Sequence, residues 1–362
     1  MMHHKAYKYR IYPTQEQEVL FRKIIGSTRF VFNYFLARWN EVYAETGKGL
    51  SYSDCATQLP ILKQTYPWLK EVDSIALQSA ARHLSDAFDR FFKKQNQEPR
   101  FKGKRNPAQS YTTRYVNGNI SIHGNLLQLP KVGLVQFANS REVQGRILSA
   151  TVRLAPSGKW FVTLVCEVSM ELLPINERTL GIDLGIKSLA VTTDGEVIQN
   201  PKIFSKSEHQ LAKWQRRMAR RKKGGRNWQK AKNKVARIHE RIQCMRQDHL
   251  HKLTTKWIRE NQTICLETLA IASMLKNEKL AKHISDAAWG ELARQLRYKA
   301  KWYGRSLKEA PIFAPTSQTC HMCGVVQPAV KNLAVRTWTC LSCGTVHDRD
   351  HNAAHNIKTM AI

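Results

Sequence analysis

The chain has 362 residues and a formal net charge of +30, because 58 Lys and Arg residues outnumber 28 Asp and Glu residues; this charge favours a polyanionic partner, nucleic acid rather than a membrane surface. Apolar residues form 42% of the chain, enough for hydrophobic cores, which excludes a wholly disordered basic protein. No apolar run approaches the roughly 18 residues of a membrane-spanning helix, and the N-terminus lacks the apolar core of a secretion signal.

The first predicted elements are a strand and a run of helices. Residues 5–12 alternate basic with apolar or aromatic residues, as a short strand would. Pro13 then opens a helical region that continues to about Lys94, in which apolar residues recur mostly at three- and four-residue spacing. We expect breaks in this region near Gly47 and Pro60.

Short strands are predicted next. Between residues 101 and about 170, β-rich runs are separated by turn dipeptides at Asn117-Gly118, His123-Gly124 and Ser157-Gly158. The simplest architecture is a small β-barrel of residues 1–12 and 100–174, completed by the N-terminal strand. Residues 13–99 are then a helical block inserted into that barrel.

A strand pair is predicted after Pro174, in the segment LGIDLGIKSLAVTTDGEVI. Two-residue periodicity places Asp183 between Gly181 and Gly185 on one face, and the other face carries Leu180, Ile182, Leu184 and Ile186. Glycines beside an aspartate leave room for a metal ion and a phosphate to approach the backbone. The alternative is an aspartate whose carboxylate is satisfied by neighbouring backbone amides.

The densest charge run lies between Lys202 and Lys256. It contains 18 Lys or Arg residues and only three acids, with Trp214 and Trp228 interleaved. This imbalance exceeds what ion pairing along a helix can neutralise, so it favours contact with nucleic-acid phosphates and stacking on the aromatic rings. The alternative is a solvated helix face. The residues assigned to the contact are Arg216, Arg217, Arg220, Arg221, Lys222, Lys223 and Arg226.

A buried strand and an amphipathic helix follow. In TICLETL, Thr263, Cys265 and Glu267 share one face. A carboxylate at the end of an apolar strand must be paired, exposed or ligating a metal. The helix repeats apolar residues at helical spacing, and we assign these to a core: Ala288, Trp289, Leu292, Leu296 and Ala300.

The strongest local motif consists of two CxxC pairs near the C-terminus. Cys320 and Cys323 form the first pair, Cys340 and Cys343 the second, and 16 residues separate them, as in zinc ribbons. Four thiolates close a tetrahedral Zn²⁺ site without an open position, so the predicted role is structural. The other cysteines are scattered singly, which favours a reducing cytosol. Two disulfides are the alternative.

The segment HDRDHNAAHNI comes directly after the cysteines. Asp350 is placed to cap a helix that begins near Asn352, and a simple N-cap is the alternative to a functional role. Three acids, Asp183, Glu267 and Asp350, then lie on elements of one strand-rich, basic domain. Phosphodiester hydrolysis needs such a cluster to hold two Mg²⁺ (or Mn²⁺) ions.

The order of these motifs resembles the transposon-encoded TnpB family, small relatives of the type V CRISPR effectors. The resemblance rests on GIDLGIKSLAV, LETL, a helix ending RYKAKWYG, the CxxC pairs and DRDHNAAHNI, and it extends to the opening KYRIYPT and RFVFN. Matched position by position, the family's catalytic acids fall on Asp183, Glu267 and Asp350. Thr268 departs from the family, which often has an acid there, and Asp348 is a weaker alternative to Asp350.

The resemblance implies a multidomain fold of α+β and α/β parts. The first part is a wedge-type β-barrel, residues 1–12 and 100–174, that carries a helical recognition insert, residues 13–99. The second is an RNase H-like (RuvC) nuclease domain, residues 175–309 and 346–362, interrupted by a zinc ribbon, residues 310–345.

The resemblance also implies a function. Family members use a guide RNA derived from the transposon end to cut double-stranded DNA beside a short flanking motif. We therefore expect an RNA-guided, Mg²⁺-dependent DNA endonuclease with a structural Zn²⁺, in the cytoplasm of a prokaryote and on the nucleoid when bound to DNA. Two alternatives stay open: an RNA-guided DNA-binding repressor without cleavage, and a transposase that joins DNA ends.

Overall fold

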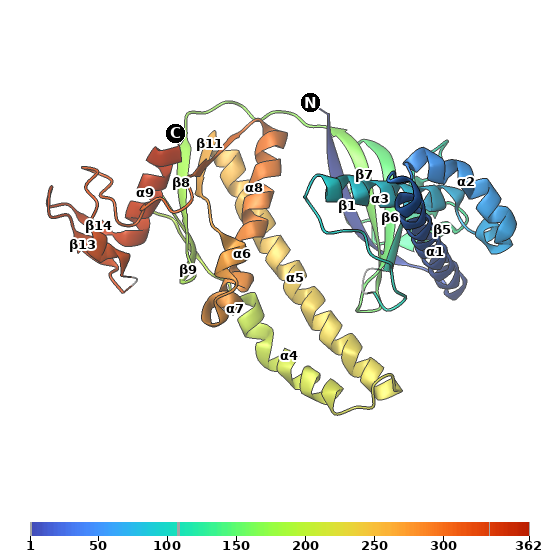
Figure 1. The fold of residues 1–362 in the computed structure, drawn as a ribbon. Coiled ribbons are helices and arrows are strands. Elements are labelled where there is room, and N and C mark those ends of the chain that lie inside the picture. The colour runs from blue at the N-terminus through green and yellow to red at the C-terminus, as the bar shows by residue number, and fades with distance from the viewer. Residues whose placement is uncertain (1, 107–108, 333, 362) are drawn as a thin grey trace. The chain divides into compact units, whose positions relative to one another are not determined.

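The computed structural model describes residues 2–106, 109–332 and 334–361. The chain divides into two compact units, Met2–Ser169 and Met170–Ile362, and each unit has a main β-sheet of its own (Figure 1). Among the described residues, no helix carries an apolar stretch long enough to cross a bilayer.

The first unit is built on a seven-stranded antiparallel sheet. Its strands are β1 (Met2–Tyr12), β2 (Gln109–Arg114), β3 (Ser121–His123), β4 (Leu126–Leu129), β5 (Gly133–Phe137), β6 (Arg146–Leu154) and β7 (Trp160–Ser169). Their order in the sheet is β2-β6-β7-β1-β5-β4-β3. The predicted N-terminal strand is confirmed, and it lies at the centre of the sheet because it pairs with both β7 and β5.

This sheet is open, so the predicted closed β-barrel is wrong. Within the described residues, β2 and β3 end the sheet and do not pair with each other. The β3–β5 meander has strands of only three to five residues, and Ile11 and Tyr12 are the two β1 residues that join it to the sheet. So short a meander cannot curl round to the far edge. Instead, helices pack against β2 and cover that edge.

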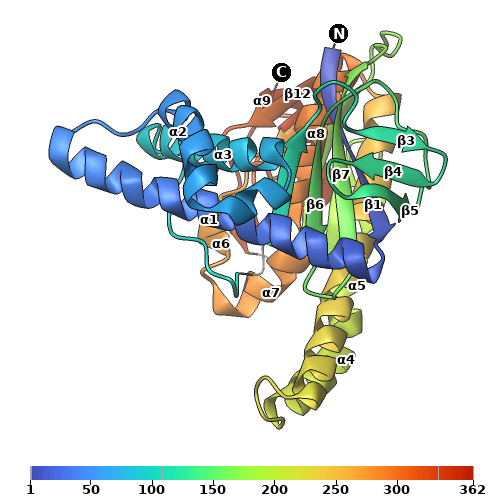
Figure 2. The same cartoon turned by 90° about the vertical axis from the view of Figure 1, so that its right-hand side faces the viewer.

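Helices lie between β1 and β2 in the sequence, and α1, α2 and α3 pack together in one group (Figure 2). They are α1 (Gln15–Thr46), α2 (Tyr52–Thr65), the 3₁₀ turn η1 (Pro67–Glu71) and α3 (Ser74–Phe92). The Thr14 side chain caps the N–H of Gln17, and Gly47 ends α1 in the left-handed region at φ 68°. Both the predicted helix start and the break near Gly47 are confirmed.

The predicted break at Pro60 is wrong, because Pro60 lies inside α2. A proline in a helix removes one N–H donor and disfavours the preceding turn. Here the neighbouring Leu59 and Leu62 are both buried. Their packing holds the helix through the proline, and α2 continues until Thr65.

The second unit contains a five-stranded sheet, ordered β10-β9-β8-β11-β12. Its strands are β8 (Thr179–Leu184), β9 (Ser188–Thr192), β10 (Val197–Gln199), β11 (Thr263–Glu267) and β12 (Ser306–Ala310). The first three are antiparallel neighbours, which confirms the predicted strand pair, whereas β8, β11 and β12 run parallel. Parallel neighbours need long crossovers, and helices supply them.

The helices of this unit are α4 (Ile203–Ala219), α5 (Arg226–Glu260), α6 (Ile271–Met274), α7 (Glu278–Ala287), α8 (Trp289–Tyr303) and α9 (Arg349–Ala361). A small hairpin of β13 (Thr337–Thr339) and β14 (Val346–Asp348), with the 3₁₀ turn η2 (Pro328–Lys331), contains the second cysteine pair. The strand β14 leads directly into α9.

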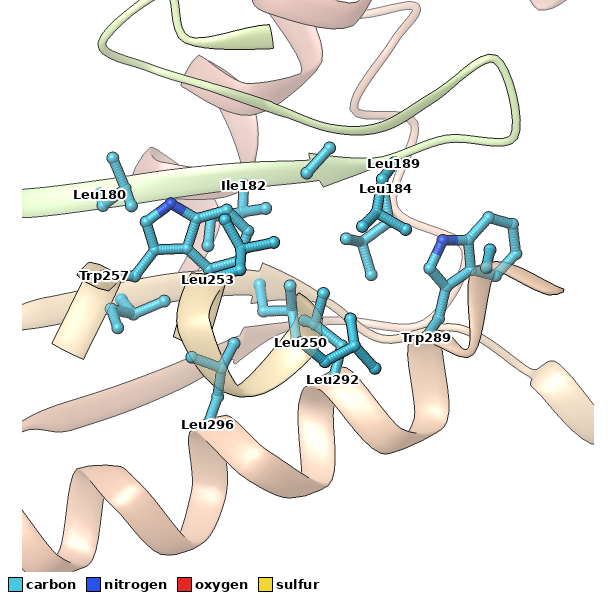
Figure 3. Packing of buried hydrophobic residues seen from close by; sticks show 14 of the residues in the cluster. Leu180, Ile182, Leu184, Leu189, Leu250, Leu253, Trp257, Trp289, Leu292 and Leu296 are labelled. Atoms are coloured by element: carbon cyan, nitrogen blue, oxygen red, sulfur yellow. The ribbon is translucent and has the colours of Figure 1, made fainter. Parts of the chain in front are cut away.

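Two layers of helices enclose this sheet. On one face, leucines and tryptophans of α5 and α8 interdigitate with Leu180, Ile182 and Leu184 of β8 (Figure 3). Of the predicted core positions, Trp289, Leu292, Leu296 and Ala300 lie buried in this cluster and are confirmed, and Ala288 packs against it half-buried at the start of α8. On the other face, Ile357 of α9 packs against Cys265 and Ala310. The strand alternation read from the sequence thus separates an apolar face from the face that carries Asp183 and Glu267.

Candidate functional site

Two of the predicted acids meet at the carboxyl ends of adjacent parallel strands. Leu266 of β11 pairs with Ile182 of β8, so the next residue on each strand brings Glu267 beside Asp183. Both point away from the apolar cluster, towards the face covered by α9. The Leu184 N–H donates to Glu267 Oε1 at 2.9 Å and fixes that carboxylate. In open α/β sheets, ligands bind at this edge.

The third acid reaches the same edge because α9 lies very close to β8. A Cβ atom built on Gly181 would be 2.3 Å from the carbonyl oxygen of Ala354, so only glycine permits this approach. The prediction that Gly181 leaves room for a metal ion and a phosphate is therefore wrong. Its missing side chain makes room for a helix, and the helix brings Asp350.

Asp348 caps α9 and leaves Asp350 free of that role. The helix begins at Arg349 rather than near Asn352. Asp348 Oδ1 accepts from the N–H groups of Asp350 and His351 at 3.0 and 2.9 Å. The prediction that Asp350 is the N-cap is wrong. The strand β14 ends at Asp348 and α9 begins at the next residue, so Asp348 occupies the N-cap position. The Asp350 carboxylate instead pairs with Arg336 at 3.3 Å.

The three carboxylates interact electrostatically. Burial raises the pKa of Asp183 well above its ordinary value, the charges of Glu267 and Asp350 raise it further, and Arg349 opposes them. Burial also raises the pKa of Glu267 to about 7, although the hydrogen bond from the Leu184 N–H acts to lower it. A cation would relieve this repulsion and desolvation. Carboxylate oxygens are donors that Mg²⁺ and Mn²⁺ prefer, so the chemistry of the donor set suits a divalent hard metal. The three carboxylates are not gathered as closely as the four cysteine sulfurs.

The four predicted cysteines gather into one cluster. Their Sγ atoms all lie within 4.8 Å of one another. Zn–S bonds of about 2.3 Å in a tetrahedron imply S···S distances of about 3.8 Å, and the pairs Cys320–Cys343 and Cys323–Cys340 are at 3.7 and 3.5 Å. The cluster therefore fits one zinc ion. The described part of the chain contains no other metal-binding group of three or more His, Cys, Asp or Glu residues gathered in this way.

Hydrogen bonds tie α9 to the first cysteine pair. The N–H of His321 donates to Asn352 Oδ1 at 3.0 Å. Asn352 and Asn356 both donate through Nδ2 to the carbonyl oxygen of Thr319, at 2.8 and 2.6 Å. Sequence reasoning missed these two asparagines, although their four-residue spacing places both amides on one helix face. The element that carries Asp350 is thus attached to the cysteine cluster.

His347 is a third residue that the sequence did not reveal. It is buried, and its Nε2 lies 3.1 Å from Cys320 Sγ. An imidazole N–H in that position donates to a thiolate and orients it. His347 lies on β14, three residues before Asp350, so the cysteine cluster and the third acid are fixed by the same short segment.

The seven predicted nucleic-acid contacts lie together at the tip of a helical hairpin formed by α4 and α5 (Figure 1). They occupy the last turn of α4, the connecting loop and the first residue of α5, and all are exposed. None makes an ion pair with a described residue. The base of the hairpin is anchored by buried Asp286, which accepts from the N–H of Phe204 and from Arg246.

Comparison with known families gives three matches along the chain. OrfB_IS605, described as "Probable transposase", matches residues 163–278. A "Cas12f1-like, TNB domain" matches residues 289–357, which include the cysteine cluster and Asp350. A "Helix-turn-helix domain" matches residues 1–48, where the structure has β1 and α1.

Curated relatives align over almost the whole chain. A protein of Streptomyces pristinaespiralis named "Putative RNA-guided DNA endonuclease" is 40% identical over 98% of this chain and 88% of its own length. A protein of Escherichia coli K12 with the same description, InsQ, is 34% identical over 98% of this chain and 91% of its own.

Solved structures share the fold at low sequence identity. A Cas12f1 complex with guide RNA and target DNA superposes with a TM-score of 0.63 at 14% identity, covering 99% of both chains. The mini-RNA-guided endonuclease Cas_phi3 gives a TM-score of 0.52 at 10% identity, over 99% of this chain and 92% of that one. At these identities the likeness concerns the fold alone.

Proposed function

We propose, since this chain belongs to the TnpB family of RNA-guided DNA endonucleases, that it cuts target DNA chosen by base pairing with a bound guide RNA. The five-stranded sheet and α9 would form a RuvC-like nuclease of RNase H fold, made of residues 175–309 and 346–362. The observation that supports this proposal best is the convergence of Asp183, Glu267 and Asp350, from distant parts of the sequence, on one edge of the sheet.

In this proposal, Asp183, Glu267 and Asp350 hold two divalent ions. When bound, Mg²⁺ or Mn²⁺ ions would activate the attacking water and stabilise the leaving oxygen. The chain itself supplies the positions: the Leu184 N–H orients Glu267, and the Asp348 cap sets the start of the helix that carries Asp350. Arg336, paired with Asp350, would compensate part of the negative charge until metal binds.

The four cysteines would hold a structural zinc in a ribbon of residues 310–345. Its closed set of thiolates leaves no position for a substrate. The ribbon's proposed task is to hold α9, because Asn352 and Asn356 bond to the backbone beside Cys320. Zinc would therefore support the nuclease by fixing Asp350.

The first unit would bind the guide RNA and the DNA motif that flanks the target. In this assignment, residues 1–12 and 100–174 form a wedge domain and residues 13–99 a recognition insert, with an open sheet in place of the expected barrel. The guide would derive from the transposon end, and the basic tip of the α4–α5 hairpin would contact its phosphates. We place this activity in a prokaryotic cytoplasm.

The test is guided cleavage by the reconstituted complex. RNA that co-purifies with the protein is sequenced, and its guide region is redirected to a plasmid target in Mg²⁺. The proposal predicts cuts only in the matched plasmid. Binding without cleavage in any divalent metal would instead support an RNA-guided repressor. Products in which DNA ends are joined would support a transposase.

A further inference from the structure

The groove between α4 and α5 is a feature that the proposed cleavage chemistry does not use. It has a volume of about 680 Å³, within the range of roughly 300–1,000 Å³ that is typical of small-ligand sites. Five of its described lining residues are cationic and none is acidic: Arg217, Arg221, Lys230, Lys234 and Arg237. The groove therefore suits a ligand with several negative charges.

The cations of this groove are not neutralised by ion pairs within the described part of the chain. None of the five cations forms an ion pair with a described residue, whereas Lys252, farther along α5, pairs with Asp248 at 2.8 Å. Cations gathered on two adjacent helices repel one another. An anionic ligand would remove this repulsion on binding.

Trp214 gives the groove a flat aromatic surface. Its ring is half-buried between the helices. The Arg217 guanidinium and the Lys234 Nζ lie over the ring, 4.9 Å and 5.9 Å from its centroid, so a stacking base would take the place of these cations and leave them to the adjoining phosphates. Single-stranded nucleic acids are bound by this combination of an aromatic platform for a base and cations for the backbone. A paired base inside a duplex has no free face to offer, so the ligand must be unpaired.

We propose that the α4–α5 groove binds one unpaired nucleotide, with its base stacked on Trp214 and the adjoining phosphates on Arg217 and Lys234. This inference rests on the proposed function, which supplies two sources of unpaired strand: the guide RNA and the DNA strand that it displaces. Both sources present the same chemistry to the groove, and the experiment separates them.

The test measures binding of labelled single strands of about ten nucleotides to the full-length protein by fluorescence anisotropy. The probes are oligouridylate RNA, oligothymidylate DNA and an abasic strand of equal charge. Trp214→Ala should weaken binding of a base-bearing strand by about 5- to 150-fold and leave the abasic strand unaffected. Trp214→Phe should retain most of the affinity. A larger loss for RNA assigns the nucleotide to the guide, and a larger loss for DNA assigns it to the displaced strand.

Matched controls come from the same hairpin. Trp228 has its own lysine, Lys232, 5.3 Å from its ring centroid but does not line the groove. Trp228→Ala should therefore weaken binding of a base-bearing strand clearly less than Trp214→Ala does. Lys234→Gln should lower the salt slope of binding by about 0.7, as expected for one single-strand phosphate contact. Lys252→Gln removes a lysine that is paired with Asp248 and should leave the salt slope unchanged.

The inference is overturned if Trp214→Ala weakens base-bearing and abasic strands equally, or has no effect on either. It is also overturned if Trp228→Ala matches Trp214→Ala. Circular dichroism melts of each variant show whether a loss reflects unfolding, in which case the Trp214→Phe comparison decides. Guided cleavage by the wild-type protein is scored separately, so that failure of the groove and failure of the nuclease proposal are distinguished.

Discussion

The four cysteines and the three acids are two groups of candidate metal ligands in one unit, and they are assembled in opposite ways. The cysteines lie between residues 320 and 343, on two local turns, and their sulfurs are already at the spacing of a zinc site. The acids come from residues 183, 267 and 350, on two strands and a helix that meet only in the folded sheet. One group is local in the sequence, and the other is a product of the topology.

The two groups differ in energetics as well. Four thiolates around one zinc ion form a closed site. Because this site does not exist in the unfolded chain, the free energy of zinc binding contributes directly to the free energy of folding. Burial raises the pKa values of Asp183 and Glu267, and the charges of Glu267 and Asp350 raise the pKa of Asp183 further. Such crowding costs stability and is typical of functional sites. The cysteine cluster is therefore expected to stabilise the fold, and the acid cluster to serve the reaction.

The largest expected effect is loss of the zinc site. Cys320→Ser should remove bound zinc and unfold the cysteine turns, because structural zinc sites contribute roughly 10–16 kcal/mol in isolated fingers at neutral pH. Zinc content by elemental analysis and the melting temperature measure the effect. Cys244→Ser changes an exposed cysteine outside the cluster and should alter neither. Wild-type protein without zinc would refute the assignment.

Replacing one acid should affect the reaction and spare the zinc. Asp183→Asn should reduce guided cleavage by about 10³-fold or more, which corresponds to over about 4 kcal/mol of transition-state stabilisation. Target binding, measured by gel shift, should persist because base pairing and basic surfaces carry it. Asp194→Asn is the control: this residue lies at a turn and pairs with Arg178 on the surface. Near wild-type cleavage by Asp183→Asn would exclude this strand as the nuclease site.

A smaller effect tests whether the two groups are coupled. Asn356→Ala removes buried hydrogen bonds to the Thr319 and Thr316 carbonyl oxygens. The expected cost is about 1–3 kcal/mol of stability, with zinc retained and cleavage reduced because α9 loses an anchor. Thr359 lies on the same helix, and its hydroxyl donates to the carbonyl oxygen of His355 within α9. Thr359→Ala should therefore have little effect on melting or cleavage. Unchanged melting and cleavage for Asn356→Ala would show that the ribbon does not support Asp350.

The smallest effect concerns a buried charge outside both groups. Lys299 Nζ donates to the carbonyl oxygen of His251 and to two threonine hydroxyls, and burial lowers the pKa of Lys299 to about 8. The unfolded chain, with a pKa of about 10.4, binds more protons between these values. Stability should therefore rise with pH across that window.

Urea titrations at two pH values test this sign. Between about pH 7.5 and 9.5, the wild type should gain on the order of 2 kcal/mol relative to Lys299→Met. Lys301→Met, an exposed lysine on the same helix, should follow the wild type. A constant difference between wild type and Lys299→Met would mean that this lysine is not destabilised by burial.

The amino-acid sequence was sufficient to predict the local chemistry of both ligand groups. Alternation along each strand assigned Asp183 and Glu267 to the face opposite that strand's apolar residues, and the CxxC spacing assigned four ligands to one cluster. These inferences need only backbone periodicity and side-chain type, which neighbouring residues determine. Family resemblance then supplied the partners, because several motifs occur in one order along the chain.

The way in which distant segments meet became known only from the folded arrangement. Local patterns predicted a β-barrel in the first unit, but the sheet there is open. The short strands β3–β5 join it through only two residues of β1 and cannot reach the far edge. In the folded chain, α9 packs against Gly181. Asp348 caps the helix, and Asp350 lies near the other two acids. Hydrogen bonds also tie Asn352 and Asn356 to the cysteine turns. Each of these outcomes depends on packing between segments that are far apart in the sequence. The space available to one segment is set by the position of the other. A local sequence pattern does not specify that position.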